Sequence, residues 1–377
     1  MTEPLCVFRV ISWLPVGGIE RRLLAIMPAL QNRGYSMHLV CTREYGALAG
    51  ELRSKGIPVK LIQFNSRFDP SALWRLRSEL VRHKAQVVHS HMYRSSVPAT
   101  VAAKLAGVPA IFSQVHNLDT WQSGRQIWMD RQLARFRSGV ITVSRAVQEE
   151  VCEVLRLPES KVPILYNGVD VDQFKPDAAL RLSTREALGV PADRPMILVP
   201  ARLHPQKLPL ETLASFERIL PKLPCKPILA FAGAGKLEDE LKAAVAERGL
   251  GDSVLQLGKR DDMVGLYNAA DVVLLSSLKE GFSNAIIEAL ACGKPVVAAD
   301  VGGNKEAVST PEVGWIHPCR NFDLMETQLV EALTHWERLA ERASACRARG
   351  EDFSLEAMVN ETDRLYRSAL EAKGITR

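Results

Sequence analysis

The chain alternates short apolar runs with longer amphipathic segments along its whole length. Short runs rich in Val, Ile and Leu are typical of buried parallel strands, whereas apolar residues spaced three and four apart indicate helices. The stretch 280–306, EGFSNAIIEALACGKPVVAADVGGNKE, illustrates both patterns. The apolar run Asp271–Ser276 precedes this stretch, a helical stripe covers Phe282–Cys292, and a second buried run follows at Val296–Ala299. This alternation predicts an α/β fold with mainly parallel sheets covered on both faces.

The pattern in the first half of the chain predicts one complete set of alternating strands and helices. Its expected strands are Cys6–Ser12, His38–Cys41, Val59–Gln63, Gln86–Ser90, Ala110–Ser113, Val140–Val143 and Pro163–Tyr166. Its expected helices are Glu20–Gln31, Gly46–Ser54, Ser71–His83, Ser96–Ala106, Gly124–Arg135 and Arg145–Leu155.

The polar segment 176–195, with prolines at both ends and one short helical stretch inside, separates this set from a second one. The second set predicts strands at Met196–Pro200, Pro227–Ala232, Val254–Leu257, Asp271–Ser276 and Val296–Ala299. Its helices are expected at Leu208–Leu220, Lys236–Arg248, Asp262–Ala269, Phe282–Cys292 and Ser354–Glu371, and Asn321–Arg347 is expected to be one long helix or two joined ones. A length of 377 residues also favours two domains. We therefore expect two doubly wound, Rossmann-like domains that face each other across a cleft.

Charge is distributed unevenly between the two halves. Residues 1–170 contain 22 Lys and Arg against 13 Asp and Glu, whereas the whole chain has a net charge of only +5. An excess of positive charge favours an anionic partner, such as a membrane surface or a phosphorylated acceptor, although a solvated surface is the alternative. The composition itself, 47% hydrophobic and 24% charged, is that of an ordinary globular protein.

The N-terminal stretch resembles a first strand rather than a signal peptide, and no apolar run is long enough to span a bilayer. The seven cysteines are scattered without CxxC or Cys/His clusters, which argues against a zinc site and a disulfide framework. These features predict a cytoplasmic protein.

Several residues that could bind a ligand or take part in catalysis lie at the ends of predicted strands. Gly17 and Gly18 follow the first strand and precede a helix, so backbone N–H groups could approach a ligand, or the pair could be a plain turn. His89 and His91 end one strand and His116 follows the next. Imidazoles at that edge could bind hydroxyl groups or move a proton, although a satisfied structural histidine is the usual alternative.

Two cations and two carboxylates mark the second half. Arg202 and Lys207 flank the loop ARLHPQK after a buried strand, which suits a diphosphate. Glu280 precedes the helix 282–292 and Glu288 lies within it. The glycines of GAG at 233–235 do not form a dinucleotide fingerprint, because position 238 is Glu, and no P-loop is present.

Two helices of the first half combine Trp with arginines, namely the one that contains Trp74 and the one that contains Trp128. Basic amphipathic helices can rest on an anionic membrane, although most such helices are ordinary surface elements. The membrane interpretation therefore stays open beside the structural one.

Taken in order, these motifs resemble those of the retaining, nucleotide-sugar-dependent glycosyltransferases of the GT-B fold, family 4 (glycosyl transferases group 1). The resemblance runs nearly end to end, and its last part contains paired glutamates with seven residues between, then GKPVVA and GGNKE. The other motifs are Gly17-Gly18-Ile19-Glu20, His89-Ser90-His91, His116, Val143-Ser144, Tyr166-Asn167-Gly168-Val169-Asp170, Ala201-Arg202-Leu203 with Lys207, and Gly233-Ala234-Gly235.

The resemblance implies an acceptor-binding domain at 1–175, a nucleotide-sugar domain at 176–353, and a C-terminal helix at 354–377 that crosses back to the first domain. It also implies roles for single residues. The implied catalytic residues are His91, Arg202, Lys207 and Glu280. The implied donor-binding residues are Gly17, Gly18, Arg202, Lys207, Gly233, Arg260, Glu280, Phe282, Ser283, Asn284 and Glu288. His89 and His116 are expected on the acceptor side.

Within this set, Arg202 and Lys207 match the pair that holds the donor diphosphate. Glu280 matches the glutamate beside the sugar hydroxyls, and Glu288 the one that binds the ribose. No cofactor and no metal are expected, because the two cations and helix N-termini offset the leaving-group charge. The implied mechanism retains the anomeric configuration, with the diphosphate itself taking the acceptor proton.

The expected partners are a nucleoside-diphosphate sugar, with UDP or GDP favoured, and a glycan or polyprenol-linked acceptor in cell-surface polysaccharide or glycolipid synthesis. An anionic surface at the inner face of the cytoplasmic membrane is a further candidate partner, and no nucleic acid is expected. Two alternatives stay open: a nucleotide-sugar epimerase of similar fold, and a non-catalytic, glycosyltransferase-like binding subunit. A phosphorylase would need a cofactor lysine and a much longer chain.

Overall fold

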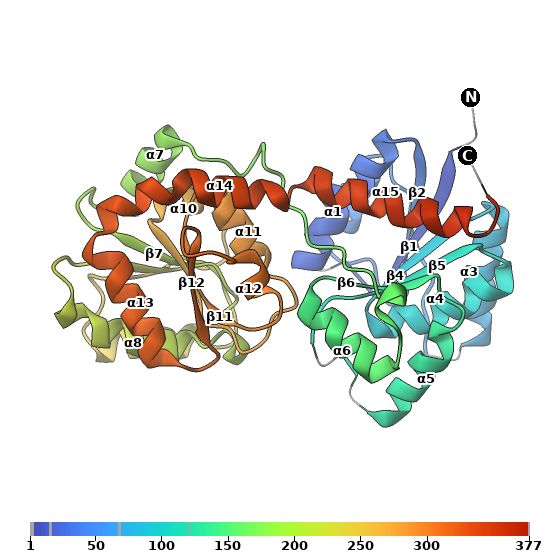
Figure 1. The fold of residues 1–377 in the computed structure, drawn as a ribbon, viewed down its shortest axis with the longest axis horizontal. Helices are drawn as coiled ribbons and strands as arrows, with labels where there is room; N and C mark the ends of the chain where they lie inside the picture. Colours follow the sequence, from blue (N-terminus) through green and yellow to red (C-terminus); the bar gives the residue numbers. More distant parts are fainter. Residues whose placement is uncertain (1–3, 15–16, 67–68, 119, 122, 376–377) are drawn as a thin grey trace. The chain divides into compact units, whose positions relative to one another are not determined.

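The computed structural model describes residues 4–14, 17–66, 69–118, 120–121 and 123–375. The chain divides into two units, and the two are described separately (Figure 1). Unit 1 comprises residues 1–168 and 355–377, and unit 2 comprises residues 169–354. The observed division lies before the expected boundary at 175/176, because Arg347 donates hydrogen bonds to the carbonyl oxygens of Val171 and Phe174 and so holds 169–175 within unit 2.

Unit 1 is built around a parallel sheet of six strands in the order β3-β2-β1-β4-β5-β6. The strands are β1 (Leu5–Ile11), β2 (Tyr35–Cys41), β3 (Val59–Leu61), β4 (Val87–His91), β5 (Ala110–Val115) and β6 (Gly139–Thr142). The helices are α1 (Gly18–Asn32), α2 (Ala49–Ser54), α3 (Pro70–Arg82), α4 (Met92–Ala106), α5 (Gly124–Ala134), α6 (Arg145–Leu155), the 3₁₀ turn η1 (Glu159–Lys161) and α15 (Leu355–Glu371).

The two faces of this sheet are covered by different helices. One core joins β1, β2 and β5 to α1, α2 and α15. The other packs α3 and α4 against the opposite face. The C-terminal helix α15 therefore forms part of unit 1, and Asp363 accepts a hydrogen bond of 2.6 Å from the hydroxyl of Tyr35 in β2.

Unit 2 repeats this plan with a six-stranded sheet in the order β12-β11-β10-β7-β8-β9. Its strands are β7 (Met196–Val199), β8 (Ile228–Phe231), β9 (Val254–Gln256), β10 (Val272–Leu275), β11 (Val296–Asp300) and β12 (Gly314–Pro318). Its helices are α7 (Ala178–Leu188), α8 (Pro209–Ile219), α9 (Glu238–Glu247), α10 (Met263–Ala269), α11 (Asn284–Ala291), α12 (Asn304–Ala307), α13 (Phe322–Thr334) and α14 (Ala343–Asp352), with 3₁₀ turns η2 (Pro205–Lys207), η3 (Leu220–Lys222) and η4 (Trp336–Arg342).

The apolar runs expected to be parallel strands form the two sheets, with two differences. Pro163–Tyr166 is not a strand, since it makes only a single bridge between Ile164 and Thr142. Conversely, β12 was not predicted, because its five residues begin with Gly314 and end with Pro318. The first turn of α4 also begins at Met92, earlier than the expected Ser96.

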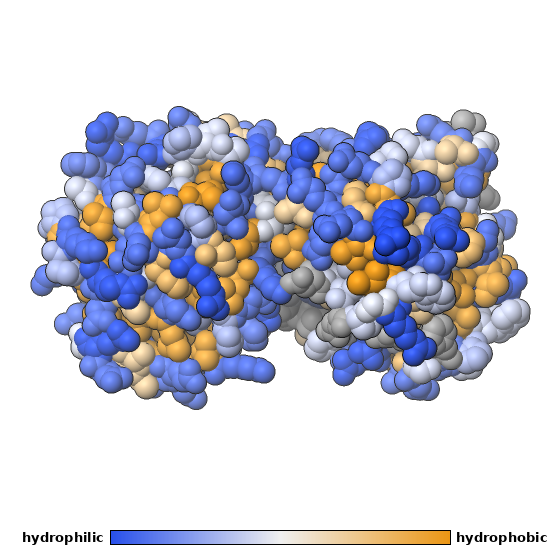
Figure 2. Space-filling view, turned by 60° about the horizontal axis from the view of Figure 1, so that its bottom comes forward, coloured by the Kyte–Doolittle hydropathy of each residue, from blue (hydrophilic) through white to orange (hydrophobic). Residues whose placement is uncertain are grey.

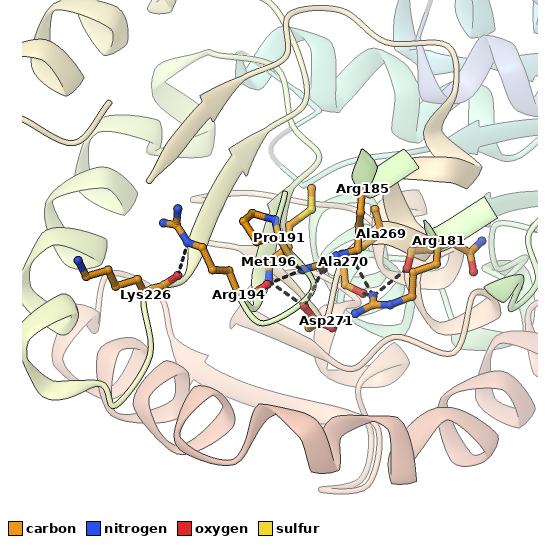
Figure 3. Close-up of polar contacts among 10 residues, drawn as sticks. Arg181, Arg185, Pro191, Arg194, Met196, Lys226, Ala269, Ala270 and Asp271 are labelled. Carbon is orange, nitrogen blue, oxygen red and sulfur yellow. Dashed lines mark hydrogen bonds and ion pairs between the residues drawn. The ribbon is translucent and has the colours of Figure 1, made fainter. Parts of the chain in front are cut away.

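A buried ionic cluster holds the N-terminal ends of β7 and β10 together (Figure 3). Asp271, which directly precedes β10, accepts hydrogen bonds from Arg181 and Arg185 of α7 and from the backbone N–H of Met196. Arg185 also donates to the carbonyl oxygens of Ala269 and Pro191, so its charge is well satisfied. This cluster therefore joins α7 to the sheet at the edge opposite to the carboxyl ends of the strands.

Candidate functional site

Both sheets have a topological switch point, at which the strand order reverses so that the chain connections on either side run towards opposite edges of the sheet. In unit 1 it lies between β1 and β4, and in unit 2 between β7 and β10. In open α/β sheets, ligands bind outside the carboxyl ends of the strands at such points. The motif residues after β1, β4, β7 and β10 are therefore at the expected edges.

Lys207 and Glu280 form an ion pair at the switch point of unit 2. Lys207 ends the η2 turn after β7, Glu280 follows β10, and the ammonium Nζ donates to Glu280 Oε1. Their side chains are only 16% and 12% exposed. A pair this close at a partly buried sheet edge keeps a cation and an anion fixed beside a place where a ligand could bind.

The two loops that carry this pair are also joined through their backbones. Leu278 N–H donates to the carbonyl oxygen of Gln206 at 2.8 Å, and the Gln206 side chain donates to the carbonyl oxygen of Lys279 at 2.9 Å. Ser276 at the end of β10 donates to the carbonyl oxygen of Lys207 at 3.2 Å. The two loops that carry the ion pair are thus joined to each other by three hydrogen bonds.

Close packing of glycines determines the shape of the surrounding loops. A Cβ on Gly233, after β8, would lie 2.1 Å from the carbonyl oxygen of Ala201. A Cβ on Gly302, after β11, would lie 2.1 Å from the carbonyl oxygen of Glu280. Gly233 therefore supports the Arg202 loop, and Gly302 supports the Glu280 loop.

Helix α11 begins beside Glu280 and carries the second glutamate. Ser283 is its N-cap residue, and Phe282 is buried against Phe353 with ring centroids 5.0 Å apart. Glu288 Oε2 accepts a hydrogen bond of 2.8 Å from the hydroxyl of Tyr267 in α10. Burial and the nearby Glu288 carboxylate raise the pKa of Tyr267 well above its usual 10.0, so this hydroxyl stays a donor.

Arg202 and Arg260, two further expected donor contacts of unit 2, lie farther towards solvent. Arg202 is exposed and forms no ion pair among the residues that the structure describes. Arg260 pairs with Asp262, with Nε 2.8 Å from Oδ1. Arg260 would have to leave Asp262 in order to bind a nucleobase through its guanidinium.

The expected histidines meet at the carboxyl ends of β4 and β5 in unit 1. His91 Nδ1 lies 3.0 Å from His116 Nε2, and the two rings stack with centroids 5.3 Å apart. His89 stacks on His91 at 4.7 Å. The three histidine side chains therefore lie together, as their positions at the ends of neighbouring strands predicted.

His89 and His91 are both buried and hydrogen-bonded within unit 1, and their expected roles stay predictions. His89 is fully buried, with Nδ1 2.7 Å from the Tyr366 hydroxyl and Nε2 3.1 Å from Gln114 Oε1. His91 is 1% exposed, and its Nε2 lies 3.3 Å from Nη1 of Arg9. Since both nitrogens of each ring already have protein partners, neither imidazole is available to a substrate in this structure.

All three histidines are kept neutral. Burial, together with the charge of Arg9, lowers the pKa of each ring well below its usual 6.5. Arg9 is itself only 2% exposed and forms no ion pair with a carboxylate among the described residues. The set is therefore a neutral imidazole array beside a buried guanidinium.

His116 lines the larger of two pockets in unit 1. The pocket, of about 480 Å³ and within unit 1, is also lined by Trp13, Glu20, Arg43 and Arg94. The two arginines are exposed, and Arg43 lies 5.9 Å from the Trp13 ring centroid. An aromatic face, hydrogen-bonding groups and an excess of cations suit a polar ligand with a negative group.

Gly17 and Gly18 begin α1 beside this pocket, but a carboxylate already lies there. Glu20 is buried, and a Cβ on Gly17 would come within 2.5 Å of its Oε2. Burial raises the pKa of Glu20, and a hydrogen bond from its own backbone N–H opposes that shift. A phosphate could approach this helix N-terminus only if the Glu20 side chain moved away.

Several contributing residues were not predicted from the sequence: Arg9, Gln114, Tyr267 and Tyr366. Arg9 offered a signal, since it is the one charged residue in the otherwise apolar strand LCVFRVI. The others resemble ordinary core or helix residues. Among the described residues, no three His, Cys, Asp or Glu side chains are grouped so that they could hold a metal ion.

Comparison with known proteins defines the class. The structure of the Anabaena protein HepE in complex with UDP superposes with a TM-score of 0.85 at 22% identity, covering 97% of this chain and 100% of that one. A glycosyltransferase from Rickettsia africae also gives a TM-score of 0.85, at 19% identity, with 98% and 99% coverage. The architecture is therefore the GT-B fold of glycosyltransferases.

Sequence relationships then define the family. The models described as Glycosyltransferase Family 4 and Glycosyl transferases group 1 match residues 16–173 and 181–352. A D-inositol 3-phosphate glycosyltransferase of Stackebrandtia nassauensis is 30% identical over 311 residues, which cover 76% of this chain and 67% of the relative. An Escherichia coli UDP-Gal:alpha-D-GlcNAc-diphosphoundecaprenol alpha-1,3-galactosyltransferase is 26% identical over 327 residues, 84% of each chain. The chain belongs to this family and is a glycosyltransferase of the group 1 type that uses a nucleotide sugar.

Proposed function

We propose that the protein transfers a sugar from a nucleoside-diphosphate sugar, with UDP or GDP as the nucleotide, to a glycan or lipid-linked acceptor with retention of anomeric configuration. The observation that carries this proposal is the Lys207–Glu280 pair at the switch point of unit 2. A cation and a carboxylate fixed side by side can bind the two dissimilar parts of such a donor, its phosphate and its sugar hydroxyls.

The donor would be bound along the carboxyl edge of the unit 2 sheet. Lys207 and the exposed Arg202 would bind the diphosphate, with Arg202 supplying a bidentate donor and Lys207 a point charge. Glu280 would accept hydrogen bonds from the sugar, and Glu288, held by Tyr267, from the ribose. The backbone N–H groups of 282–284 at the start of α11 would add to the positive potential.

In this proposal, charge that develops on the leaving diphosphate is stabilised by Lys207, Arg202 and the start of α11. The diphosphate takes the proton of the acceptor hydroxyl, and no protein nucleophile or metal takes part. The burial of His89 and His91 supports this assignment, because neither ring offers a free nitrogen for proton transfer.

The acceptor would bind in the 480 Å³ pocket of unit 1. Relatives act on acceptors that contain phosphate, as their names state: a diphosphoundecaprenol-linked sugar and an inositol phosphate. Arg43 and Arg94 at the pocket suit such a group. We favour a lipid-linked precursor of a cell-surface polysaccharide or glycolipid, with a soluble acceptor as the second candidate.

An exposed patch on unit 1 supports binding to an anionic membrane at its inner, cytoplasmic face. The apolar–basic patch consists of Trp74, Arg77, Lys104, Leu105 and Phe136. Trp74 is 62% exposed and Leu105 is 54% exposed. Arg77 lies over the Trp74 ring and donates to the Leu105 carbonyl oxygen, and Lys104 lies over Phe136, so the five residues are contiguous. None of the described helices is long and apolar enough to cross a bilayer.

Figure 2 shows hydrophobic side chains among hydrophilic ones at the right of the view, on the unit that carries α3, α4 and α5. Co-sedimentation with phosphatidylglycerol vesicles and with neutral phosphatidylcholine vesicles tests the membrane proposal. Trp74→Ser should reduce binding to the anionic vesicles, whereas Leu182→Ser, at an equally exposed leucine of unit 2, should not. Equal binding to both vesicle types, or none, contradicts it.

The transfer reaction itself is tested with a panel of UDP-, GDP- and ADP-sugars. Nucleotide release is followed with and without two acceptors, polyprenyl-diphosphate-linked N-acetylglucosamine and inositol phosphate. Release that requires an acceptor supports the proposal. Isomerised sugar without acceptor would indicate the epimerase, and nucleotide binding without release would indicate a non-catalytic binding subunit.

A further inference from the structure

Leu208 has an unusual backbone conformation directly after Lys207. Its φ of +52° and ψ of +47° lie in the left-handed region, which a leucine rarely adopts. The residue is buried, and it separates the η2 turn from Pro209, the first residue of α8. Residues other than glycine persist in this region only where the surrounding structure holds them, and they cluster at functional sites. The contacts that hold Leu208 therefore bear on where the Lys207 side chain lies.

Two buried hydroxyl groups hold the backbone at this point. Ser276, which follows β10, donates to the Lys207 carbonyl oxygen at 3.2 Å. Thr212, early in α8, contacts the Leu208 carbonyl oxygen with its Oγ1 at 2.8 Å. The two hydroxyl oxygens lie 2.6 Å from each other. Ser276 is 3% exposed and Thr212 is 1% exposed, so bulk water does not compete for these contacts.

These three contacts share only two hydroxyl protons, and this determines the direction of the hydrogen bonds. The Leu208 carbonyl oxygen already accepts from the backbone N–H of Thr212 at 3.0 Å. The Thr212 hydroxyl can therefore donate to Ser276, and Ser276 in turn to Lys207, without leaving an acceptor unsatisfied. The reverse direction would take the Ser276 proton away from the Lys207 carbonyl oxygen. Hydrogen bonds that follow one another in this way strengthen each other.

We propose that Ser276 and Thr212 are positioning residues, which hold the left-handed turn at Leu208 and thereby keep the Lys207 ammonium group beside Glu280. The hydrogen-bonded series runs from α8 through the residue after β10 to the backbone of Lys207, whose side chain forms the ion pair. Its consequence for catalysis deepens the proposed transfer function and rests on it, because that function has Lys207 bind the donor diphosphate. The series itself does not depend on that function.

Variants that lack one hydroxyl test the positioning role in the full-length protein. Ser276→Ala and Thr212→Val each remove one hydroxyl, and Thr212→Ser keeps one at the same position. Thr362→Val is the matched control, since Thr362 is buried in α15 of unit 1 and has the same contact to the fourth preceding carbonyl, that of Met358, at 2.8 Å. Ser276→Ala and Thr212→Val should lower kcat/KM for acceptor-dependent nucleotide release about tenfold, whereas Thr212→Ser and Thr362→Val should stay close to the wild-type rate. Equal loss in Thr212→Val and Thr212→Ser, or a wild-type rate in Ser276→Ala, contradicts the proposal.

The double variant distinguishes a connected series from two separate contacts. If Thr212 acts through Ser276, the protein that carries both Thr212→Val and Ser276→Ala should lose no more activity than Ser276→Ala alone. The effects of two independent contacts would multiply, so a loss of about 100-fold in the double variant contradicts the connection between the two hydroxyl groups.

Ligand binding separates a misplaced Lys207 from general damage to unit 2. The probes are UDP and uridine, together with GDP and guanosine. Ser276→Ala should raise the Kd of the diphosphate that binds about tenfold and leave the Kd of its nucleoside unchanged, because the nucleoside has no phosphate for Lys207 to contact. An equal rise for both members of the pair contradicts the positioning role.

Amide hydrogen exchange reports on the turn without any ligand. The backbone N–H of Lys207 donates to the His204 carbonyl oxygen at 2.8 Å within η2. This amide should exchange faster in Ser276→Ala than in wild type, and at the wild-type rate in Thr362→Val. Unchanged exchange in folded Ser276→Ala protein overturns the proposal. If exchange rises as stated but no nucleotide binds to the wild-type protein, the proposed function fails and the positioning of the turn stands.

Discussion

Replacing Gly302 by alanine should displace the Glu280 loop. Gly302 follows β11 with φ of +55°, in the left-handed region that costs an alanine about 1–2 kcal/mol. Its added Cβ would lie 2.1 Å from the carbonyl oxygen of Glu280, whereas real contacts of this kind are essentially never shorter than 3.0 Å. Because the obstructing atom belongs to the backbone, no rotamer change can relieve the contact.

The size of the effect follows from this geometry. The Glu280 backbone must move by about 0.9 Å, the difference between the two distances. Gly303 N–H also donates to the carbonyl oxygen of Gly281 at 2.8 Å, so the displacement is passed to the next peptide. A misplacement of about 1 Å can cost roughly 100-fold in rate, equivalent to about 2.7 kcal/mol. We expect kcat/KM of Gly302→Ala to fall by about that factor.

Gly251→Ala is the matched control, because it lies in the same unit, has no left-handed φ, and its added Cβ meets no atom within 4 Å. Both variants are assayed by initial rates of nucleotide release from the active sugar nucleotide, at a temperature at which circular dichroism shows both to be folded. The reasoning is refuted if folded Gly302→Ala keeps a kcat/KM within twofold of Gly251→Ala.

Three further predictions concern residues around the site and the core. Tyr267→Phe removes the donor to Glu288 and should weaken UDP binding about tenfold, as expected for a hydrogen bond to a charged group; an unchanged Kd by calorimetry contradicts the ribose role. Asp271→Asn leaves Arg185 buried without its carboxylate, so urea denaturation should show the free energy of unfolding lowered by about 3–5 kcal/mol. The kcat/KM of the folded variant should be unchanged, and a loss of activity would show that this cluster is not purely structural. His89 and His91 have folded-state pKa values well below 6.5, so they stay neutral in the folded protein while the same residues take up protons in the unfolded chain. The free energy of unfolding should therefore fall as the pH decreases from 7.5 to 5.5. A constant or rising free energy of unfolding over this range contradicts their burial.

The sequence predicted the alternation of strands and helices well because parallel strands buried on both faces are continuous apolar runs. It failed where that signal is weak. Strand β12 is short and bounded by Gly314 and Pro318, while Pro163–Tyr166 has strand-like composition but reaches only Thr142. Whether an apolar run pairs depends on its neighbours in the sheet, which local pattern does not contain.

The candidate site shows the same division. Lys207 and Glu280 could each be placed at a strand end, but their direct contact spans 73 positions and depends on β7 and β10 being neighbours in the sheet. For the histidines, the motif predicted that the rings lie close together, but it did not reveal that His89 and His91 are buried and hydrogen-bonded to other side chains. Tyr366 of α15, 277 positions along the chain, is hydrogen-bonded to His89, and Arg9 of β1 is hydrogen-bonded to His91. Only the fold reveals these contacts and the burial of both rings.

The central claim is that the Lys207–Glu280 pair binds a nucleotide sugar for transfer, and kinetics of Lys207→Met and Glu280→Gln test it most directly. Each variant should lower kcat/KM for acceptor-dependent nucleotide release by about 10²–10³, the usual effect of losing one group that stabilises developing charge. The Leu182→Ser protein, changed at an exposed site of the same unit, should keep wild-type activity. Folded Lys207→Met or Glu280→Gln protein with wild-type kcat/KM would contradict the account.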